Sequence, residues 1–191
     1  MRITGGRARG IVLKVPRRGS LRPATDFLRQ AVFSSLGPLV AQARVLDVFA
    51  GTGSYGLEAL SRGAAHAVWL DSDRQTVAAI QANLAAVAKS LGAQNPAALG
   101  HACEGDVFAW QPPGQAGFDL VFVDPPYALL PLFGEKLLER AASWSAPGAN
   151  ARLLLEAPGE FVVAPPAGWV LARHLGEGRR QPSSLIFRRA D

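Results

Sequence analysis

The most specific chemical signal in the chain is the sequence Asp-Pro-Pro-Tyr at 124–127, directly after the apolar run 120–123. Two successive prolines fix the backbone and remove two N–H donors. The Asp124 carboxylate and the Pro125 carbonyl therefore remain as hydrogen-bond acceptors, and Tyr127 adds a flat aromatic face. Such a set suits a planar amino group on a nucleobase, although a proline-rich turn with a packed tyrosine is the alternative. We assign Asp124, Pro125, Pro126 and Tyr127 to a candidate catalytic loop.

A second candidate site is the glycine-rich stretch that follows the apolar run 44–49. Gly51 and Gly53 permit a tight turn and close approach of the backbone to a ligand. Together with Gly56 they satisfy the dinucleotide fingerprint G-x-G-x-x-G, which is a weak match by itself and also fits a purely structural turn. Asp47 would suit a cofactor with a cationic amino group, such as S-adenosylmethionine, directly or through water. Alternatively, it fastens the glycine loop by hydrogen bonds.

Further carboxylates are expected at the ends of the next two strands. Asp71 could accept hydrogen bonds from both hydroxyls of a ribose. Asp106 could accept the exocyclic amine of adenine, although an aspartate in a surface turn is an equally good interpretation. The residues expected to bind the cofactor are Asp47, Phe49, Gly51, Thr52, Gly53, Asp71, Ser72, Asp106 and Val107.

The charge distribution points to a polyanionic partner. The formal net charge is +5, and seven basic side chains precede Asp26, the first acidic residue. Most of the basic residues are arginines, whose planar guanidinium groups bind phosphate oxygens in a bidentate manner. Nucleic acid is therefore the expected partner, and an ordinary solvated surface is the alternative. The candidate RNA contacts are Arg2, Arg7, Arg9, Arg17, Arg18, Arg22 and Arg29.

The elements that must position these residues alternate between strand and helix. Residues 1–23 predict a basic β-hairpin arm, and residues 24–191 predict one α/β domain. Within this domain, Thr25 can cap a helix that ends at about Leu36. The predicted strands are 44–49, 67–70, 97–103, 118–123 and 151–156; the predicted helices are 54–62, 73–91 and 129–144; 169–174 and 184–188 predict a final antiparallel pair.

Length and composition exclude several classes of protein. The 191 residues, of which 49% are hydrophobic, fit one domain with a full-sized core. Cys103 is the only cysteine, so no intrachain disulfide can form and a reducing, cytoplasmic location fits. No apolar run approaches the ~20 residues that a membrane-spanning helix needs, and the N-terminal residues do not resemble a signal peptide. We expect a monomer without a metal site or a membrane association.

The combined motifs resemble the RsmD family of bacterial 16S rRNA guanine-N2 methyltransferases. The similarity is carried by 3–6, 9–10, 21–26, 49–53, 56–64 and 124–127. It implies a Rossmann-like class I methyltransferase fold, with a seven-stranded, mostly parallel sheet and helices on both faces. It also implies S-adenosylmethionine as cofactor and, as substrate, one guanine N2 of 16S rRNA in the small ribosomal subunit or an assembly intermediate. Phe27, Gln30 and Tyr55 depart from the family pattern.

Three alternatives remain open at this point. The nearest is an adenine-N6 DNA methyltransferase, although these enzymes more often carry asparagine at the position of Asp124. An NAD-dependent oxidoreductase is supported only by the glycine fingerprint. A non-catalytic RNA-binding factor that retains the fold is the third.

Overall fold

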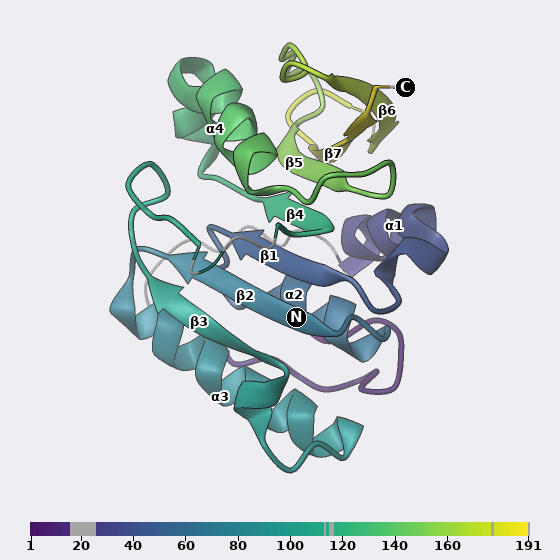
Figure 1. Ribbon diagram of the computed structural model, residues 1–191, viewed down its shortest axis with the longest axis vertical. Coiled ribbons are helices and arrows are strands. Elements are labelled where there is room, and N and C mark those ends of the chain that lie inside the picture. Colours follow the sequence, from purple (N-terminus) through teal and green to yellow (C-terminus); the bar gives the residue numbers. More distant parts are fainter. Residues whose placement is uncertain (16–25, 113, 115–116, 177, 191) are drawn as a thin grey trace.

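A computed structural model of the chain describes residues 1–15, 26–112, 114, 117–176 and 178–190. Its centre is a seven-stranded sheet in the order β3-β2-β1-β4-β5-β7-β6 (Figure 1). β1 to β5 are parallel, and β7 runs antiparallel to both β5 and β6. The strands are β1 (Arg44–Val48), β2 (His66–Asp71), β3 (Gly100–Glu104), β4 (Leu120–Val123), β5 (Arg152–Pro158), β6 (Trp169–Leu175) and β7 (Pro182–Arg189).

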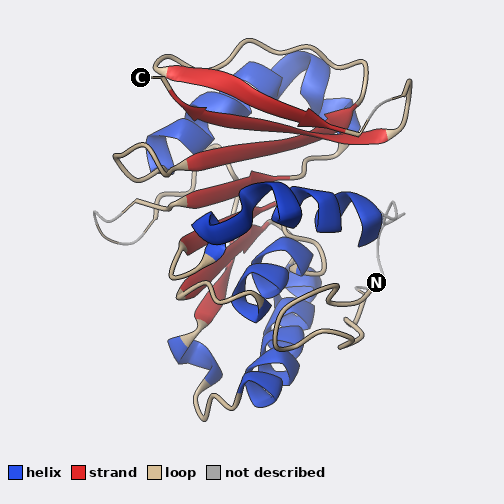
Figure 2. Ribbon diagram, turned by 90° about the vertical axis from the view of Figure 1, so that its right-hand side faces the viewer, coloured by secondary structure: helices blue, strands red, loops and turns tan. Residues whose placement is uncertain are grey.

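Helices cover both faces of this sheet, so the predicted α/β arrangement is confirmed (Figure 2). Alternate residues of each strand point to opposite faces. Val45 of β1 packs in the core that α1 (Asp26–Leu36), α2 (Ser54–Ser61) and α3 (Arg74–Leu91) cover, whereas Leu46 packs in the core under α4 (Leu130–Trp144). No helix in the described part of the chain is both long and apolar enough to cross a membrane.

Two predicted strands begin later in the structure than the sequence indicates. The prediction of a strand from residue 97 is wrong, because Pro96–Ala98 form a 3₁₀ turn and β3 begins at Gly100. The Asn95 side chain stabilises this turn by accepting a hydrogen bond from the backbone N–H of Ala97. Phe118 lies outside β4 and makes an isolated bridge to Ser145. The expected helix cap, Thr25, lies outside the described residues.

The described part of the basic N-terminal segment packs on the domain. Its antiparallel pairing consists of one bridge between Arg2 and Val12, next to a 2.9 Å hydrogen bond from the Ile3 N–H to the Ile11 carbonyl. Ile3 and Leu13 are buried in the core that α1, α2 and α3 cover. The first 15 residues are thus held against the rest of the molecule through apolar side chains, while Arg2 is exposed.

Candidate active site

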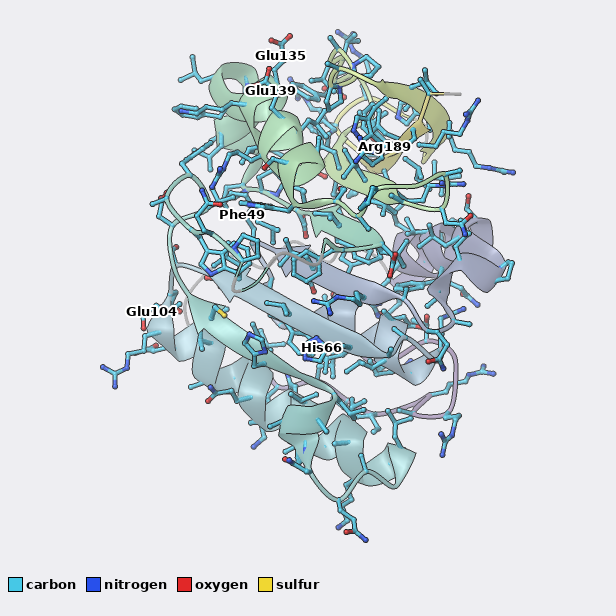
Figure 3. All side chains as sticks on the ribbon, in the orientation of Figure 1. Phe49, His66, Glu104, Glu135, Glu139 and Arg189 are labelled. Atoms are coloured by element: carbon cyan, nitrogen blue, oxygen red, sulfur yellow. The ribbon has the colours of Figure 1, made fainter. Side chains whose placement is uncertain are left out.

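The strand order brings the glycine loop and the Asp-Pro-Pro-Tyr loop together. The chain crosses over between β1 and β4, which are neighbours in the sheet, and such a switch point leaves a crevice at the carboxyl ends of the strands. Val48 and Val123, the last residues of the two strands, are paired. Directly beyond them, the Asp124 N–H donates to the Val48 carbonyl over 3.2 Å. Figure 3 labels Phe49 at this end of the sheet.

The glycine loop has an unusual backbone conformation. Phe49, Gly51 and Gly53 have φ angles of +58°, +54° and +77°. The left-handed region costs glycine little but costs other residues on the order of 1–3 kcal/mol. Such strain at Phe49 is typical of functional sites, where the surrounding structure enforces it.

Two strand-end carboxylates hold this loop. Asp47 Oδ2 accepts the backbone N–H of Gly56 over 2.9 Å, and Asp71 Oδ2 accepts that of Gly51 over 3.0 Å. For Asp47, the structure thus shows the loop-fastening contact that the sequence left as an alternative. Asp71 Oδ1 also accepts the N–H of Asp73. Each carboxylate oxygen can accept more than one hydrogen bond, so these contacts leave acceptor capacity for a ligand.

Two side chains that the sequence analysis did not single out, Trp69 and Asn83, hold the loop through hydrogen bonds. The Trp69 indole donates to the Gly53 carbonyl over 3.1 Å, and Asn83 donates to the Thr52 carbonyl over 3.0 Å. Asn83 also exchanges hydrogen bonds with the backbone of Lys14. The Thr52 hydroxyl donates to the thioether of Met1. The N-terminal segment is therefore coupled to the loop that is expected to bind the cofactor.

Burial changes the acid–base properties of two groups around the loop. Desolvation raises the pKa of Asp47 to about 7, and the N–H of Gly56 only partly offsets it. Desolvation also raises the pKa of Tyr55, with further contributions from the nearby carboxylates of Glu156 and Asp124. A negative charge is thus unfavourable in this interior unless a cation or a donor is supplied.

Five of the residues expected to bind the cofactor line one hollow beside β1 and β2. These residues are Phe49, Asp71, Ser72, Asp106 and Val107, and Gly105 is among the other lining residues. Asp106 is exposed, and its Oδ1 accepts the N–H groups of Phe108 and Ala109. Asp71, in contrast, is half-buried beside the apolar side chains of this hollow. Such an arrangement suits a nucleoside, because the carboxylate can bind ribose hydroxyls and the apolar walls can bind the base.

The Asp-Pro-Pro-Tyr loop leaves its aspartate accessible. Asp124 and Tyr127 are half-buried, Pro125 is buried, and Pro126 is exposed. Tyr127 begins a 3₁₀ turn, Tyr127–Leu129, that leads into α4. The predicted acceptors Asp124 and Pro125 therefore follow β4 at the crevice, next to the glycine loop.

Beside Asp124 lies a buried pair that the family pattern does not predict. The Tyr55 hydroxyl donates to Glu156 Oε2 over 2.8 Å, and the tyrosine ring stacks on Phe122 with centroids 4.8 Å apart. Tyr55 thus links α2 to β5 underneath the crevice.

The candidate RNA contacts fall into three groups. Arg2, Arg7 and Arg9 are exposed. Arg17, Arg18 and Arg22 lie outside the described residues. The prediction for Arg29 is wrong, because its side chain is fully buried and pairs with Asp26 and Glu58 at 2.8 and 3.5 Å.

Glu58 is the buried centre of this second network. Its carboxylate accepts the backbone N–H and the hydroxyl of Thr4 over 2.7 and 2.8 Å, and it pairs with Arg62 at 2.8 Å. Glu58 and Arg29 therefore fix the N-terminal segment to α1 and α2. Sequence reasoning missed this role because the partners are far apart in the chain.

Comparison with known proteins gives the family. Residues 1–180 match the family described as "Conserved hypothetical protein 95". Ribosomal RNA small subunit methyltransferase D of Haemophilus influenzae is 33% identical over 187 residues, which cover 93% of this chain and 89% of that protein. The chain belongs to the RsmD family of rRNA methyltransferases.

Solved structures agree with this RsmD-family assignment. The Escherichia coli protein yhhF is 32% identical, has a TM-score of 0.80, and is matched over 99% of this chain and 97% of its own. A more distant structure, SMU.776 complexed with SAH, is 13% identical with a TM-score of 0.64, covers 85% of this chain and 49% of its own, and shows the fold alone. The expected class I methyltransferase fold is thereby confirmed. This fold accounts for the glycine fingerprint, which was the only support for the oxidoreductase alternative.

Proposed function

We propose that this RsmD-family chain transfers a methyl group from S-adenosylmethionine to the exocyclic N2 of a guanine in 16S rRNA of the small ribosomal subunit. The observation that carries the proposal is the adjacency of the two loops. The Asp124 N–H bonds to the Val48 carbonyl, and the strained glycine loop begins at the next residue, Phe49. A methyl donor on one loop and an acceptor amine on the other would therefore meet in one crevice.

The catalytic loop provides what a guanine amine requires. The base must leave its stack to enter a pocket at the strand ends. The Asp124 carboxylate and the Pro125 carbonyl then accept the two N–H groups of N2, and the Tyr127 ring stacks on the base. These contacts orient a nitrogen that is a weak nucleophile because its lone pair is delocalised into the ring. Orientation in a desolvated crevice can supply much of the rate acceleration.

The cofactor would be held by residues of the glycine loop and the hollow beside it. S-adenosylmethionine supplies an activated methyl group on a sulfonium, so the protein needs only to bind and orient it. Asp71 would accept the ribose hydroxyls, and Asp106 the adenine amine. Burial raises the pKa of Asp47 to about 7. The positive charge of the donor's ammonium group would lower this pKa again and so favour the carboxylate form. The membership of the chain in a family of rRNA methyltransferases supports this choice of donor.

Substitution of Asp124 tests the proposal. A hydrogen bond to a charged acceptor contributes about 1.5–3 kcal/mol, so Asp124→Ala is expected to slow methyl transfer roughly 10- to 100-fold. Tritium transfer from labelled S-adenosylmethionine is measured into small subunits, protein-free rRNA and DNA, and equilibrium dialysis checks that cofactor binding is retained. Glu135→Ala, an exposed carboxylate on α4, is the control. Wild-type turnover in Asp124→Ala would refute the role of Asp124, and transfer into DNA alone would favour the adenine-N6 alternative.

The exposed arginines of the N-terminal segment are proposed to contact the rRNA. Deleting the segment would also remove the buried Ile3 and Leu13, so substitution is the cleaner test. The double variant Arg2→Gln/Arg9→Gln should weaken rRNA binding and lower the slope of log K against log salt, because each lost phosphate contact removes roughly 0.7–0.9 from that slope. An unchanged slope would show that these arginines do not contact phosphate.

A further inference from the structure

One aromatic ring is left in solvent at the start of α1. Phe27 is 79% exposed, and among the described residues it is the only phenylalanine, tyrosine or tryptophan that is exposed rather than buried or half-buried. A single exposed apolar side chain needs no explanation by itself. What Phe27 can bind therefore depends on the groups that surround it.

Phe27 lines a hollow of about 310 Å³ between α1 and the N-terminal segment. Arg2 and Arg9 of the segment line the same hollow, and so does Gln30, which lies three residues after Phe27 and thus on the same face of α1. These three residues are also exposed. The hollow therefore combines a flat apolar ring with two guanidinium groups and one amide. Phe27 and Gln30 are both departures from the family pattern.

The two arginines have no carboxylate partner in the described part of the chain. Asp26 is the one acidic residue among those that line the hollow there, and its carboxylate pairs with Arg29 at 2.8 Å. Arg2 and Arg9 take part in none of the ion pairs between described residues. The sequence of residues 16–25, which lie outside the described part, contains no aspartate or glutamate. The hollow is therefore suited to a ligand that carries negative charge.

Buried contacts hold the two walls of the hollow together. The Arg29 guanidinium donates to the carbonyl of Arg2 over 2.5 Å and pairs with Glu58 of α2 at 3.5 Å. Glu58 also accepts the backbone N–H of Thr4 over 2.7 Å. The backbone that carries Arg2 and Phe27 is thus ordered before a ligand binds, which lowers the entropic cost of binding.

The N-terminal wall of the hollow is connected directly to the glycine loop. Met1, which precedes Arg2, accepts a 3.0 Å hydrogen bond from the Thr52 hydroxyl through its sulfur. Phe27 is not among the residues that line the hollow beside β1 and β2, where the cofactor is expected. A ligand on Phe27 would therefore lie close to the candidate active site without entering it.

We propose that the Phe27 hollow is a subsite for an unpaired nucleotide of the rRNA substrate, other than the guanine that is methylated. The inference rests on the proposed function. The base stacks on the Phe27 ring, Arg2 and Arg9 bind phosphate oxygens, and the Gln30 amide bonds to an edge of the base. Unpaired RNA supplies both a flat ring and negative charge, whereas a protein interface needs a larger apolar patch than one exposed ring.

Three substitutions of Phe27 separate stacking from other contacts. Binding to small subunits and to protein-free 16S rRNA is measured for each variant. Phe27→Ala is expected to bind both about tenfold more weakly, as is typical when one stacked base loses its ring. Phe27→Leu keeps apolar volume without a flat face and should be as weak as Phe27→Ala, whereas Phe27→Trp should bind at least as tightly as wild type. Leu171→Ala, which truncates an exposed apolar residue of β6, is the matched control and should bind as wild type does.

Kinetics and fluorescence locate the subsite relative to the reaction. Phe27→Ala should raise KM for RNA about tenfold and leave kcat unchanged, because Phe27 does not touch the reacting atoms. In a series of stem-loops, 2-aminopurine replaces one unpaired base near the target guanine at a time. At one position its fluorescence should be quenched by wild type and by Phe27→Trp, but not by Phe27→Ala. Urea denaturation checks that the variants remain folded.

Four results would overturn the inference. Wild-type RNA affinity in Phe27→Ala would show that no base stacks on the ring, and wild-type affinity in Phe27→Leu would assign the ring to a simple apolar contact. A loss confined to small subunits, with normal binding to protein-free rRNA, would assign the hollow to a ribosomal protein. A fall in kcat with an unchanged KM would place Phe27 in the active site. Failure of the wild-type chain to methylate any RNA would instead refute the proposed function, and the binding and fluorescence measurements do not depend on methyl transfer.

Discussion

The buried carboxylate of Asp47 makes stability depend on pH in an unusual direction. Most native aspartates have lowered pKa values and are stabilising when ionised. Asp47 is 1% exposed, and its pKa is raised from 3.8 to about 7, chiefly by desolvation. Asp47→Asn removes the titration and keeps an oxygen that can accept the N–H of Gly56, so it isolates the cost of charging this side chain.

The direction and size of this pH dependence follow from the pKa of Asp47 in the unfolded chain, 3.8, and in the native state, about 7. Between pH 4 and 7 the native state holds a proton on Asp47 that the unfolded state has released. Stability therefore falls as pH rises through this window, by about 1.4 kcal/mol per unit and about 4 kcal/mol in all. Above pH 7 both states are ionised and this contribution is constant. Asp47→Asn lacks this loss. Its free energy of unfolding, relative to that of wild type, should therefore rise by about 4 kcal/mol between pH 4 and pH 8.

Urea denaturation of both proteins at unit intervals from pH 4 to pH 8 measures this difference. Subtracting the two free energies of unfolding removes the contributions of all other titrating groups. Glu135→Gln, which changes an exposed carboxylate, should show no comparable trend. A difference between Asp47→Asn and wild type that stays within 1 kcal/mol across the range would refute the reasoning. Asp47 would then be ionised in the native state.

Three further changes test the supports of the site. Tyr55→Phe leaves Glu156 without its 2.8 Å donor and should lower the free energy of unfolding by about 1–3 kcal/mol, measured by urea denaturation; no change would mean that the hydroxyl stabilises nothing. Arg29→Met should cost about 3 kcal/mol or more in the same assay, because it leaves Glu58 buried with a weaker set of partners, and a neutral result would contradict the assigned ion pair. Gly56→Ala places a methyl group against the indole of β2, so it should lower both stability and cofactor affinity by equilibrium dialysis; wild-type affinity would show that the loop is not held by this close packing.

The parts of the fold that could be predicted from the sequence are those with local causes. The predicted helix 73–91 is confirmed as α3: Asp73 caps it by accepting the N–H of Thr76, and Gly92 ends it in the left-handed conformation. The apolar runs before the glycine loop and before Asp124 form β1 and β4. Both candidate loops therefore follow neighbouring parallel strands, as the alternation of strands and helices implies.

The parts that could not be predicted depend on contacts between distant residues. Glu58 is a helical glutamate in the sequence, and only folding places Arg29 against it. Likewise, Asn83 joins Thr52 to Lys14 across 31 and 69 positions of the chain. Arg29 illustrates the reverse error, because a basic side chain near a basic segment indicates an RNA contact until its burial is known.

The central claim is that the crevice between the two loops methylates one guanine N2 of 16S rRNA. Its most direct test is mass spectrometry of 16S rRNA nucleosides from a strain in which the gene for this chain is deleted. The account predicts that one N2-methylguanosine disappears, that the wild-type chain restores it, and that Asp124→Ala does not. An unchanged nucleoside profile after deletion, or full restoration by Asp124→Ala, would contradict it.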